Sequence, residues 1–164
     1  MINISFIGMA ACGKSTIGKA VANKIGVSFV DTDLLIEQKH EATLEEIKNK
    51  YDYKFVRDEE EIVILGLTSS NRIISTGGSA VYSAKSMQHL KKFSKVIYIN
   101  TPLEIIMQRI DIGQKRGLAV PEGMSIPEIY SEREPMYQKY CEIILDGSKT
   151  IDQLVDETIK QLHE

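Results

Sequence analysis

The sequence is poor in cysteine, in long apolar runs and in net charge, and each shortage removes a class of protein. Its 164 residues include only Cys12 and Cys141, which provide neither a disulfide framework nor the spacing of a metal-ligand cluster. No apolar run approaches the roughly 18 residues that a membrane-spanning helix requires. A net charge of −3 offers no general attraction for nucleic acid or for an anionic membrane. We therefore expect a reduced, cytoplasmic protein that has neither as a partner.

What remains is the composition of an ordinary globular protein, with 43% apolar and 26% charged residues. The length suits one domain, so we expect residues 1–164 to fold as a single unit and as a monomer. The first residues, Met1–Ile7, lack a basic leader and are typical of a strand. We therefore expect no signal peptide.

Apolar, strand-like runs alternate with longer helical stretches along the whole chain. The predicted strands are 2–7, 28–31, 72–76, 95–100 and 142–145. The predicted helices are about 14–25, two pieces within 33–50, about 54–69, about 83–92, one that begins at Thr101-Pro102, about 127–140 and one from about 150. Strands that alternate with helices predict βαβ units, and hence a parallel sheet with helices on both faces.

Four local features refine this pattern. Thr43 and Glu46 have the spacing of a capping box, and Thr101 before Pro102 is typical of a cap followed by the first helical residue. Gly26 is a plausible helix C-cap. Residues 112–127 are mostly polar and carry several Gly and Pro, which predicts a long loop. Loops of that length are often functional lids, and we expect a lid here.

A phosphate-binding motif follows the first strand. The segment GMAACGKST matches G-x-x-x-x-G-K-[ST], with a predicted strand before it and a predicted helix after it, which argues against a chance glycine turn. Backbone N–H groups of such a loop surround the β-phosphate, the lysine reaches the β/γ oxygens, and the serine hydroxyl binds Mg²⁺. The motif therefore predicts a site for ATP and Mg²⁺, formed by Gly8, Ala11, Cys12, Gly13, Lys14, Ser15 and Thr16.

Two residues of this loop are unusual. Ala11 stands where many small-molecule kinases carry a third glycine, and Cys12 follows it. A thiol near Lys14 at a helix N-terminus could be reactive. The plainer interpretation is that Cys12 is a small residue of the loop.

Two aspartates follow the second predicted strand, at the edge of the sheet where ligands of open α/β folds bind. Asp31 can hold Mg²⁺, directly or through water, and Asp33 can accept a proton or a hydrogen bond from a substrate hydroxyl. The alternative is that one of them only caps the helix that begins nearby, for which Asp33 is well placed.

At this point the sequence resembles the shikimate kinase family over nearly its whole length. The shared pattern is the phosphate-binding loop, Asp-x-Asp after the second strand, an arginine on a following helix, a Gly-Gly-Gly turn after the third strand, an arginine-bearing lid and an Arg-x-x-x-Tyr segment. The resemblance implies a three-layer α/β/α fold of the P-loop NTPase type, with a five-stranded parallel sheet of order 2-3-1-4-5. It also implies that MgATP phosphorylates the 3-hydroxyl of shikimate.

The resemblance also assigns roles to residues outside the phosphate-binding loop. It implies that Asp31 associates with magnesium and that Asp33 holds the substrate hydroxyl, within an acceptor-binding segment at about 33–60. The remaining assignments are Arg109 beside the adenine, Gly147 in the loop that flanks the adenine, Arg116 on the lid, and Arg133 with Gly77 and Gly78 around the substrate carboxylate. Lys14, Asp33 and Arg116 would form the catalytic group.

The sequence departs from the family pattern at two places. The third glycine of the turn is Ser79, whose Cβ restricts φ and close approach. The position of the helical arginine depends on the direction of counting: Val56 occupies it when counted back from Gly77, and Arg57 when counted forward from Asp33. The apolar spacing of this helix favours the alignment of Val56, in which case one of two carboxylate-binding arginines is missing.

These departures leave three other functions open. The first is a kinase of the same fold for another hydroxy acid such as gluconate. The second is a nucleotide-binding regulatory module with little turnover, although such a protein has no evident need for Asp33 or a lid arginine. The third is a nucleoside monophosphate kinase, which the single lid arginine disfavours. The run Glu59-Glu60-Glu61 is typical of a solvated helix face, although Glu59 or Glu60 could brace an arginine.

Overall fold

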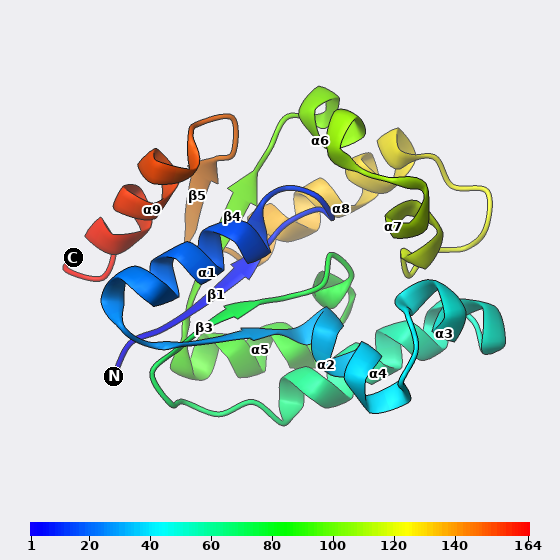
Figure 1. Ribbon diagram of the computed structural model, residues 1–164, viewed down its shortest axis with the longest axis horizontal. Helices are drawn as coiled ribbons and strands as arrows, with labels where there is room; N and C mark the ends of the chain where they lie inside the picture. The colour runs from blue at the N-terminus through cyan, green and yellow to red at the C-terminus, as the bar shows by residue number, and fades with distance from the viewer.

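The computed structural model describes residues 1–164 and has a parallel sheet with helices on both faces (Figure 1). Five strands run in the order β2-β3-β1-β4-β5, and every neighbouring pair is parallel, so the predicted fold class and strand order are confirmed. The strands are β1 (Asn3–Ile7), β2 (Ser28–Asp31), β3 (Arg72–Ser75), β4 (Lys95–Asn100) and β5 (Ile143–Asp146). The strand β1 is buried along its whole length, as its apolar sequence requires for a strand covered on both faces.

The helices pack in two layers against this sheet. In Figure 1, α1 and α9 lie together on one side, and α5 and α8 lie on the other. The helices are α1 (Lys14–Ile25), α2 (Thr32–His40), α3 (Leu44–Lys50), α4 (Tyr53–Leu65), the 3₁₀ turn η1 (Ala80–Tyr82), α5 (Ala84–Phe93), α6 (Leu103–Arg109), α7 (Ile112–Gly117), α8 (Ile126–Tyr140) and α9 (Ile151–Lys160).

The topology brings distant segments to one edge of the sheet. β1 pairs with β3 on one side and with β4 on the other, so the strand order reverses at the carboxyl end of β1. Residues 8–13 leave the sheet at this point and enter α1. Crevices at such reversals are the usual ligand sites of open α/β sheets.

Most predicted elements are found with their boundaries, and the differences have local causes. Helix α4 ends at Leu65 instead of continuing to residue 69, because the chain turns through Gly66 toward Asn71, whose φ of 53° is left-handed. The predicted loop 112–127 contains α7, which begins with a capping box between Asp111 and Gln114. The short turn η1 was not predicted.

The prediction that Thr101 caps the next helix is wrong. Pro102 occupies the N-cap of α6 and gives no side-chain cap. The buried hydroxyl of Thr101 donates instead to Cys12 O at 2.8 Å, and so ties the end of β4 to the loop that follows β1. The Thr43 hydroxyl does cap α3, by accepting a hydrogen bond from Glu46 N.

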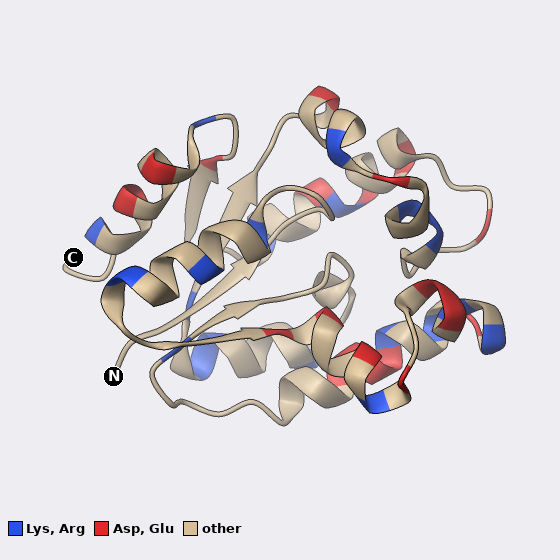
Figure 2. Cartoon of the chain, viewed as in Figure 1, with Lys and Arg blue, Asp and Glu red and all other residues tan.

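Charged residues of both signs are interspersed over the helices seen in Figure 2, which agrees with the small net charge of −3. None of the helices has the length and apolarity that crossing a membrane would require.

Candidate active site

The loop between β1 and α1 has the backbone that a phosphate cradle needs. Gly8 and Gly13 have φ values of 147° and 108°, which L side chains rarely adopt. A Cβ on Gly8 would also lie 2.8 Å from Ile99 O and 2.9 Å from Cys12 Sγ, so a side chain is excluded there by space as well. Ala11 has a φ of 63°, which strains a residue with a Cβ.

Lys14 lies inside this loop. Its Nζ donates hydrogen bonds to Gly8 O at 2.7 Å and to Met9 O at 2.8 Å, and the residue is 7% exposed. Cys12 is also buried, which favours its interpretation as a small residue of the loop. The amine is therefore held inside the loop by two backbone carbonyl groups, at the N-terminus of α1.

Three side-chain oxygen atoms meet beside the start of α1. Ser15 Oγ donates to Asp31 Oδ2 at 2.6 Å and lies 3.1 Å from Ser75 Oγ. Asp31 Oδ1 accepts hydrogen bonds from the backbone N atoms of Asp33 and Leu34, so Asp31 caps α2. The interpretation of Asp33 as the cap is therefore wrong. Carboxylate and hydroxyl oxygens are the donors that Mg²⁺ prefers, so the residues present fit this ion.

A cavity of about 870 Å³ opens from the phosphate-binding loop, a size within the range of small-molecule sites. Its walls include the predicted residues Lys14, Ser15, Asp31, Asp33, Gly78, Arg109 and Gly147. The side chain of Arg109 is exposed, and its Nη1 lies 3.5 Å from Ala11 O. Arg109 and Gly147 thus lie on the cavity with the phosphate-binding loop, and their contact with an adenine stays a prediction.

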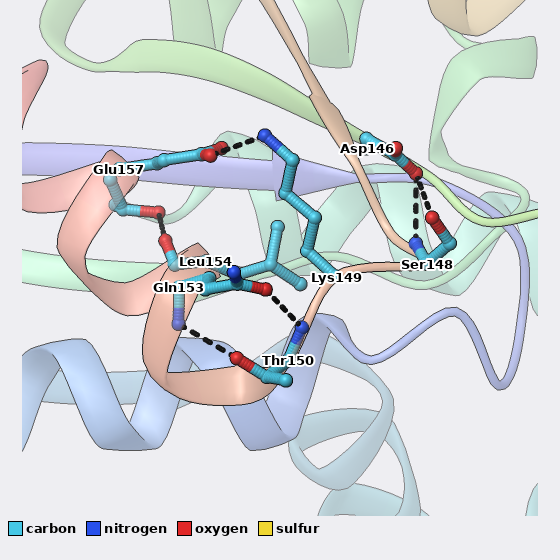
Figure 3. A network of polar contacts seen from close by, with 8 residues as sticks. Asp146, Ser148, Lys149, Thr150, Gln153, Leu154 and Glu157 are labelled. Atoms are coloured by element: carbon cyan, nitrogen blue, oxygen red, sulfur yellow. Dashed lines mark hydrogen bonds and ion pairs between the residues drawn. The ribbon is translucent and has the colours of Figure 1, made fainter.

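The loop that contains Gly147 is fixed at both ends. A Cβ on Gly147 would overlap the Thr101 hydroxyl, and its backbone N donates to Asn100 O at 2.9 Å. Figure 3 shows how the rest of the loop is held: Asp146 Oδ1 accepts two hydrogen bonds from Ser148, and Thr150 forms a capping box with Gln153 at the start of α9. These hydrogen bonds hold the backbone of the loop that contains Gly147, which forms this wall of the cavity.

Asp33 and Glu60 face each other across Gly77. A Cβ on Gly77 would lie 2.7 Å from Glu60 Oε1 and would also overlap Asp33 Oδ1, so this close approach requires glycine. Burial, followed by the charges of Glu60 and Asp31, raises the pKa of Asp33 to about 8, while Lys14 opposes the rise. Burial also raises the pKa of Glu60, against hydrogen bonds from Ser79 and Gly77. The pair holds a proton more tightly than isolated carboxylates do.

The prediction of a solvated face for Glu59-Glu60-Glu61 is wrong for its first two residues. Glu59 is 8% exposed and is paired with Lys39 at 2.6 Å, and Glu60 is 2% exposed. The departure at Ser79 causes no backbone strain, because its φ of −89° is ordinary. Its hydroxyl donates to Glu60 Oε2 at 2.7 Å, which supplies a buried carboxylate with a hydrogen bond.

Arg133 is a buried cation with unused donors. It is 1% exposed, and its Nη1 and Nη2 atoms have no hydrogen-bond partner. Only its Nε is engaged, 3.4 Å from the Tyr82 hydroxyl. A Cβ on Gly78 would lie 2.6 Å from Arg133 Nη1, and Tyr137 fixes the same turn by donating to Gly78 O at 2.7 Å. A buried guanidinium with free terminal nitrogens suits a planar anion such as a carboxylate.

The alignment that placed Val56 in the arginine position is wrong. Val56 is 3% exposed and packs with Ile36, Ile47 and Ala119 in a small apolar cluster. The next residue, Arg57, points about 100° away around α4 and lies over the Tyr82 ring, with 3.7 Å between its Cζ and the ring centroid. The apolar spacing of α4 therefore identified a core face, and Arg57 lies on the side of Arg133.

Arg116 does not line the cavity. Its Nη1 lies 3.5 Å from Glu45 Oε1, with 67% of the arginine side chain exposed. Its neighbours Gly113 and Gly117 on α7 do line the cavity, and Arg57 Nε donates to Ala119 O just beyond α7 at 2.8 Å. The segment therefore covers the site, while the arginine predicted to act there is turned toward α3.

Sequence reasoning missed three residues that shape the site. Ser75 is the last residue of β3 and Thr101 directly follows β4, and a polar residue at the carboxyl end of a strand is the signal that could have found them. Tyr82 contacts Arg57 and Arg133, and no pattern in the chain indicates this role.

Comparisons with known proteins agree with the fold and with the family that the sequence resembles. Residues 10–163 match the profile of a family described as shikimate kinase. A shikimate kinase of Clostridium botulinum is 35% identical over 157 residues, which covers 96% of this chain and 94% of the relative. The crystal structure of shikimate kinase from Aquifex aeolicus superposes with a TM-score of 0.84 at 26% identity, covering 99% of this chain and 96% of that one. The enzyme from Acinetobacter baumannii in complex with shikimate also gives 0.84, at 24% identity, covering 99% and 93%.

Proposed function

Because the chain belongs to the shikimate kinase family, we propose that it transfers the γ-phosphoryl group of ATP to the 3-hydroxyl of shikimate, a step of aromatic amino-acid biosynthesis. The observation that carries the proposal is the pair of free terminal nitrogens on buried Arg133, beside Gly78. A carboxylate is the group that would satisfy them, and shikimate carries one next to a ring of hydroxyls. We further propose that the protein acts as a cytoplasmic monomer.

The nucleotide half would hold MgATP. The phosphates would lie against the N–H groups of residues 8–16 with Lys14 among them, and the base would lie between Arg109 and Gly147. Ser15 and Asp31 would hold Mg²⁺, either directly or through water. When bound, this ion neutralises charge on the β- and γ-phosphate oxygens.

The acceptor half would position the hydroxyl. Arg133, Arg57 and the turn Gly77-Gly78-Ser79 would hold the carboxylate end of the substrate. Asp33 would accept the proton of the attacking hydroxyl as its oxygen bonds to the γ-phosphorus and ADP leaves. At neutral pH a carboxyl with a pKa of about 8 is mostly protonated, so Asp33 would have to ionise before it accepts the hydroxyl proton; once ionised, it is a stronger base than an ordinary carboxylate.

The segment from α7 to Val120 would act as the lid. Leu118, Ala119 and Val120 are buried, and Ala119 is hydrogen-bonded to Arg57, so the covering of the site is coupled to an acceptor residue. Arg116 would have to leave Glu45 and turn inward to stabilise the transferred group. Water exclusion by this segment would suppress hydrolysis of ATP.

A coupled assay of ADP release tests the proposal. Purified protein with MgATP should turn over rapidly only when shikimate is added, and the product should carry phosphate on the 3-hydroxyl by NMR. Silence with shikimate, together with intact ATP binding, would overturn the acceptor assignment and direct the assay to gluconate and other hydroxy acids. The alignment that favoured another acceptor no longer applies, because Val56 lies in the core.

A further inference from the structure

Tyr82 lies between the two acceptor-side arginines. It is the last residue of η1, and its ring centroid lies 3.7 Å from Arg57 Cζ and 5.4 Å from Arg133 Cζ. Its hydroxyl donates to Glu132 Oε2 at 2.6 Å and accepts a hydrogen bond from Arg133 Nε at 3.4 Å. One side chain therefore contacts both guanidinium groups.

Each arginine is held by its Nε atom and leaves its terminal nitrogens unused. Arg57 Nε donates to Ala119 O at 2.8 Å, and Arg133 Nε donates to Tyr82. The terminal nitrogens of Arg133 are buried without a partner, and those of Arg57 form no hydrogen bond within the protein. Two guanidinium forks are thus fixed by their stems with their ends available for an anion.

The guanidinium groups of Arg57 and Arg133 contact the same ring, and the repulsion between their positive charges must be offset. Burial and the charge of Arg133 lower the pKa of Arg57, which shows the cost of holding it there. The electron-rich face of an aromatic ring attracts a guanidinium and so offsets part of this cost. Burial and the hydrogen bond to Glu132 raise the pKa of Tyr82, so its hydroxyl stays protonated at neutral pH.

We propose that Tyr82 is a positioning residue for the carboxylate of the acceptor, because it holds Arg57 and Arg133 together so that their free ends bind one anion. The inference rests on the proposed function and deepens it, since it assigns the selectivity for an acidic acceptor to a residue outside the phosphate-binding and Gly-Gly motifs. Tyr82 acts through the arginines and does not touch the reacting atoms.

Steady-state kinetics with two acceptors tests the inference. Tyr82→Leu should raise KM for shikimate about 10-fold and leave KM for ATP unchanged. The neutral methyl ester of shikimate should bind the wild type weakly, and the variant should bind it no worse. Tyr82→Phe keeps the ring and should raise KM for shikimate only a few-fold, through the lost contact with Arg133 Nε.

Tyr53→Leu is the matched control, because Tyr53 contacts Arg57 alone, with 4.9 Å between its ring centroid and Arg57 Cζ. It should raise KM for shikimate less than Tyr82→Leu does. Equal losses for the acid and the ester, or a matching rise in KM for ATP, would show a structural role and overturn the inference. Circular dichroism verifies that each variant is folded.

The inference and the proposed function fail in different ways. If the wild type turns over shikimate and Tyr82→Leu leaves its KM unchanged, only the inference is wrong. If the wild type does not turn over shikimate, the proposed function is wrong, and thermal stabilisation by cyclohexanecarboxylate replaces the kinetic test. Loss of that stabilisation in Tyr82→Leu would still support the inference, and its retention would overturn it.

Discussion

The nucleotide half and the acceptor half of the site are built in different ways. The phosphate-binding part of the nucleotide half comes from one continuous segment, residues 8–16, whose backbone is shaped by glycine, and Asp31, Arg109 and Gly147 join it from other elements. The acceptor half comes from α2, α4, η1 and α8, and its main groups are charged side chains buried by tertiary packing. Local sequence therefore determines the phosphate-binding part of the first half, and the whole fold determines the second half.

The two halves also differ in how their charges are compensated. The amine of Lys14 has two carbonyl partners within its own loop. Arg133 has two unpartnered nitrogens, and Glu60 and Asp33 compete for a proton around Gly77. We infer that the nucleotide half is near its preferred state without a ligand, whereas the acceptor half is held in a costly arrangement that a substrate would relieve.

The largest expected effect lies in the nucleotide half. Lys14→Met should lower kcat by about 10³- to 10⁵-fold, the range found for cations that stabilise a transferred phosphoryl group. Shikimate should still bind, because the acceptor residues come from other elements. Coupled ADP release and calorimetry measure these two quantities. Lys19→Met, on the exposed face of α1, is the control and should retain activity. If Lys14→Met also lost shikimate binding, the two halves of the site would not be independent.

In the acceptor half, Asp33→Asn should lower kcat by about 10²- to 10⁴-fold, the usual contribution of a general base. The dissociation constant of ATP should stay within a factor of two or so, because Asp31 and the loop amides are untouched. Asp152→Asn on the exposed face of α9 is the matched control. Parallel losses in turnover and in ATP affinity would show that Asp33 serves both halves.

Arg133→Lys tests whether acceptor binding needs the two terminal nitrogens of the guanidinium group or only a positive charge. A lysine keeps the charge but cannot form two parallel hydrogen bonds to a carboxylate, so KM for shikimate should rise about 10- to 100-fold. Arg72→Lys, at the other end of the sheet, makes the same change far from the site and should have no effect. An unchanged KM in Arg133→Lys would mean that the acceptor half needs only a point charge.

The sequence predicted the two halves unequally, for the same physical reason. The phosphate-binding loop is a local motif, so Gly8, Gly13, Lys14 and Ser15 lie on the cavity or loop as predicted. The acceptor half depends on which face of α4 is buried, and apolar spacing alone favoured the wrong alignment at Val56. An apolar pattern identifies the side of a helix that faces the core, but it does not show which groups a charged side chain on another side, such as Arg57, contacts.

The acidic run shows the same limit. Glu60 appeared to be a surface residue because carboxylates are seldom buried without partners. Its partners, Ser79 and Gly77, come from a turn after another strand, and no spacing within α4 announces them. Tyr82 was missed because its role exists only once η1 and α8 are packed together.

The raised pKa of Asp33 should make the stability of the protein depend on pH. The pKa of Asp33 in the folded protein is raised to about 8, so the folded state binds the proton more tightly than the unfolded state does. Raising the pH removes this proton and so lowers the stability of the folded state. The wild type should therefore lose stability relative to Asp33→Asn as pH rises from about 4, the unfolded pKa, to about 8. Thermal unfolding without Mg²⁺ over this range measures the difference. A constant difference between the two proteins would mean that Asp33 titrates as it does in the unfolded chain.

The smallest expected effect returns to the nucleotide half, where Ala11 is the one strained residue of an otherwise relaxed loop. Its φ of 63° costs a residue with a Cβ about 1–2 kcal/mol. A glycine would remove that strain, but its greater conformational freedom in the unfolded chain would cancel about 0.4–1 kcal/mol of the gain. Ala11→Gly should therefore raise the free energy of unfolding by about 0.5–1 kcal/mol, measured by urea denaturation. Glu41→Gly, at an exposed position with a φ of 51°, is the control and should give a similar gain. A gain at Glu41 without one at Ala11 would mean that contacts within the loop already offset the strain, and that the nucleotide half, too, depends on its tertiary surroundings.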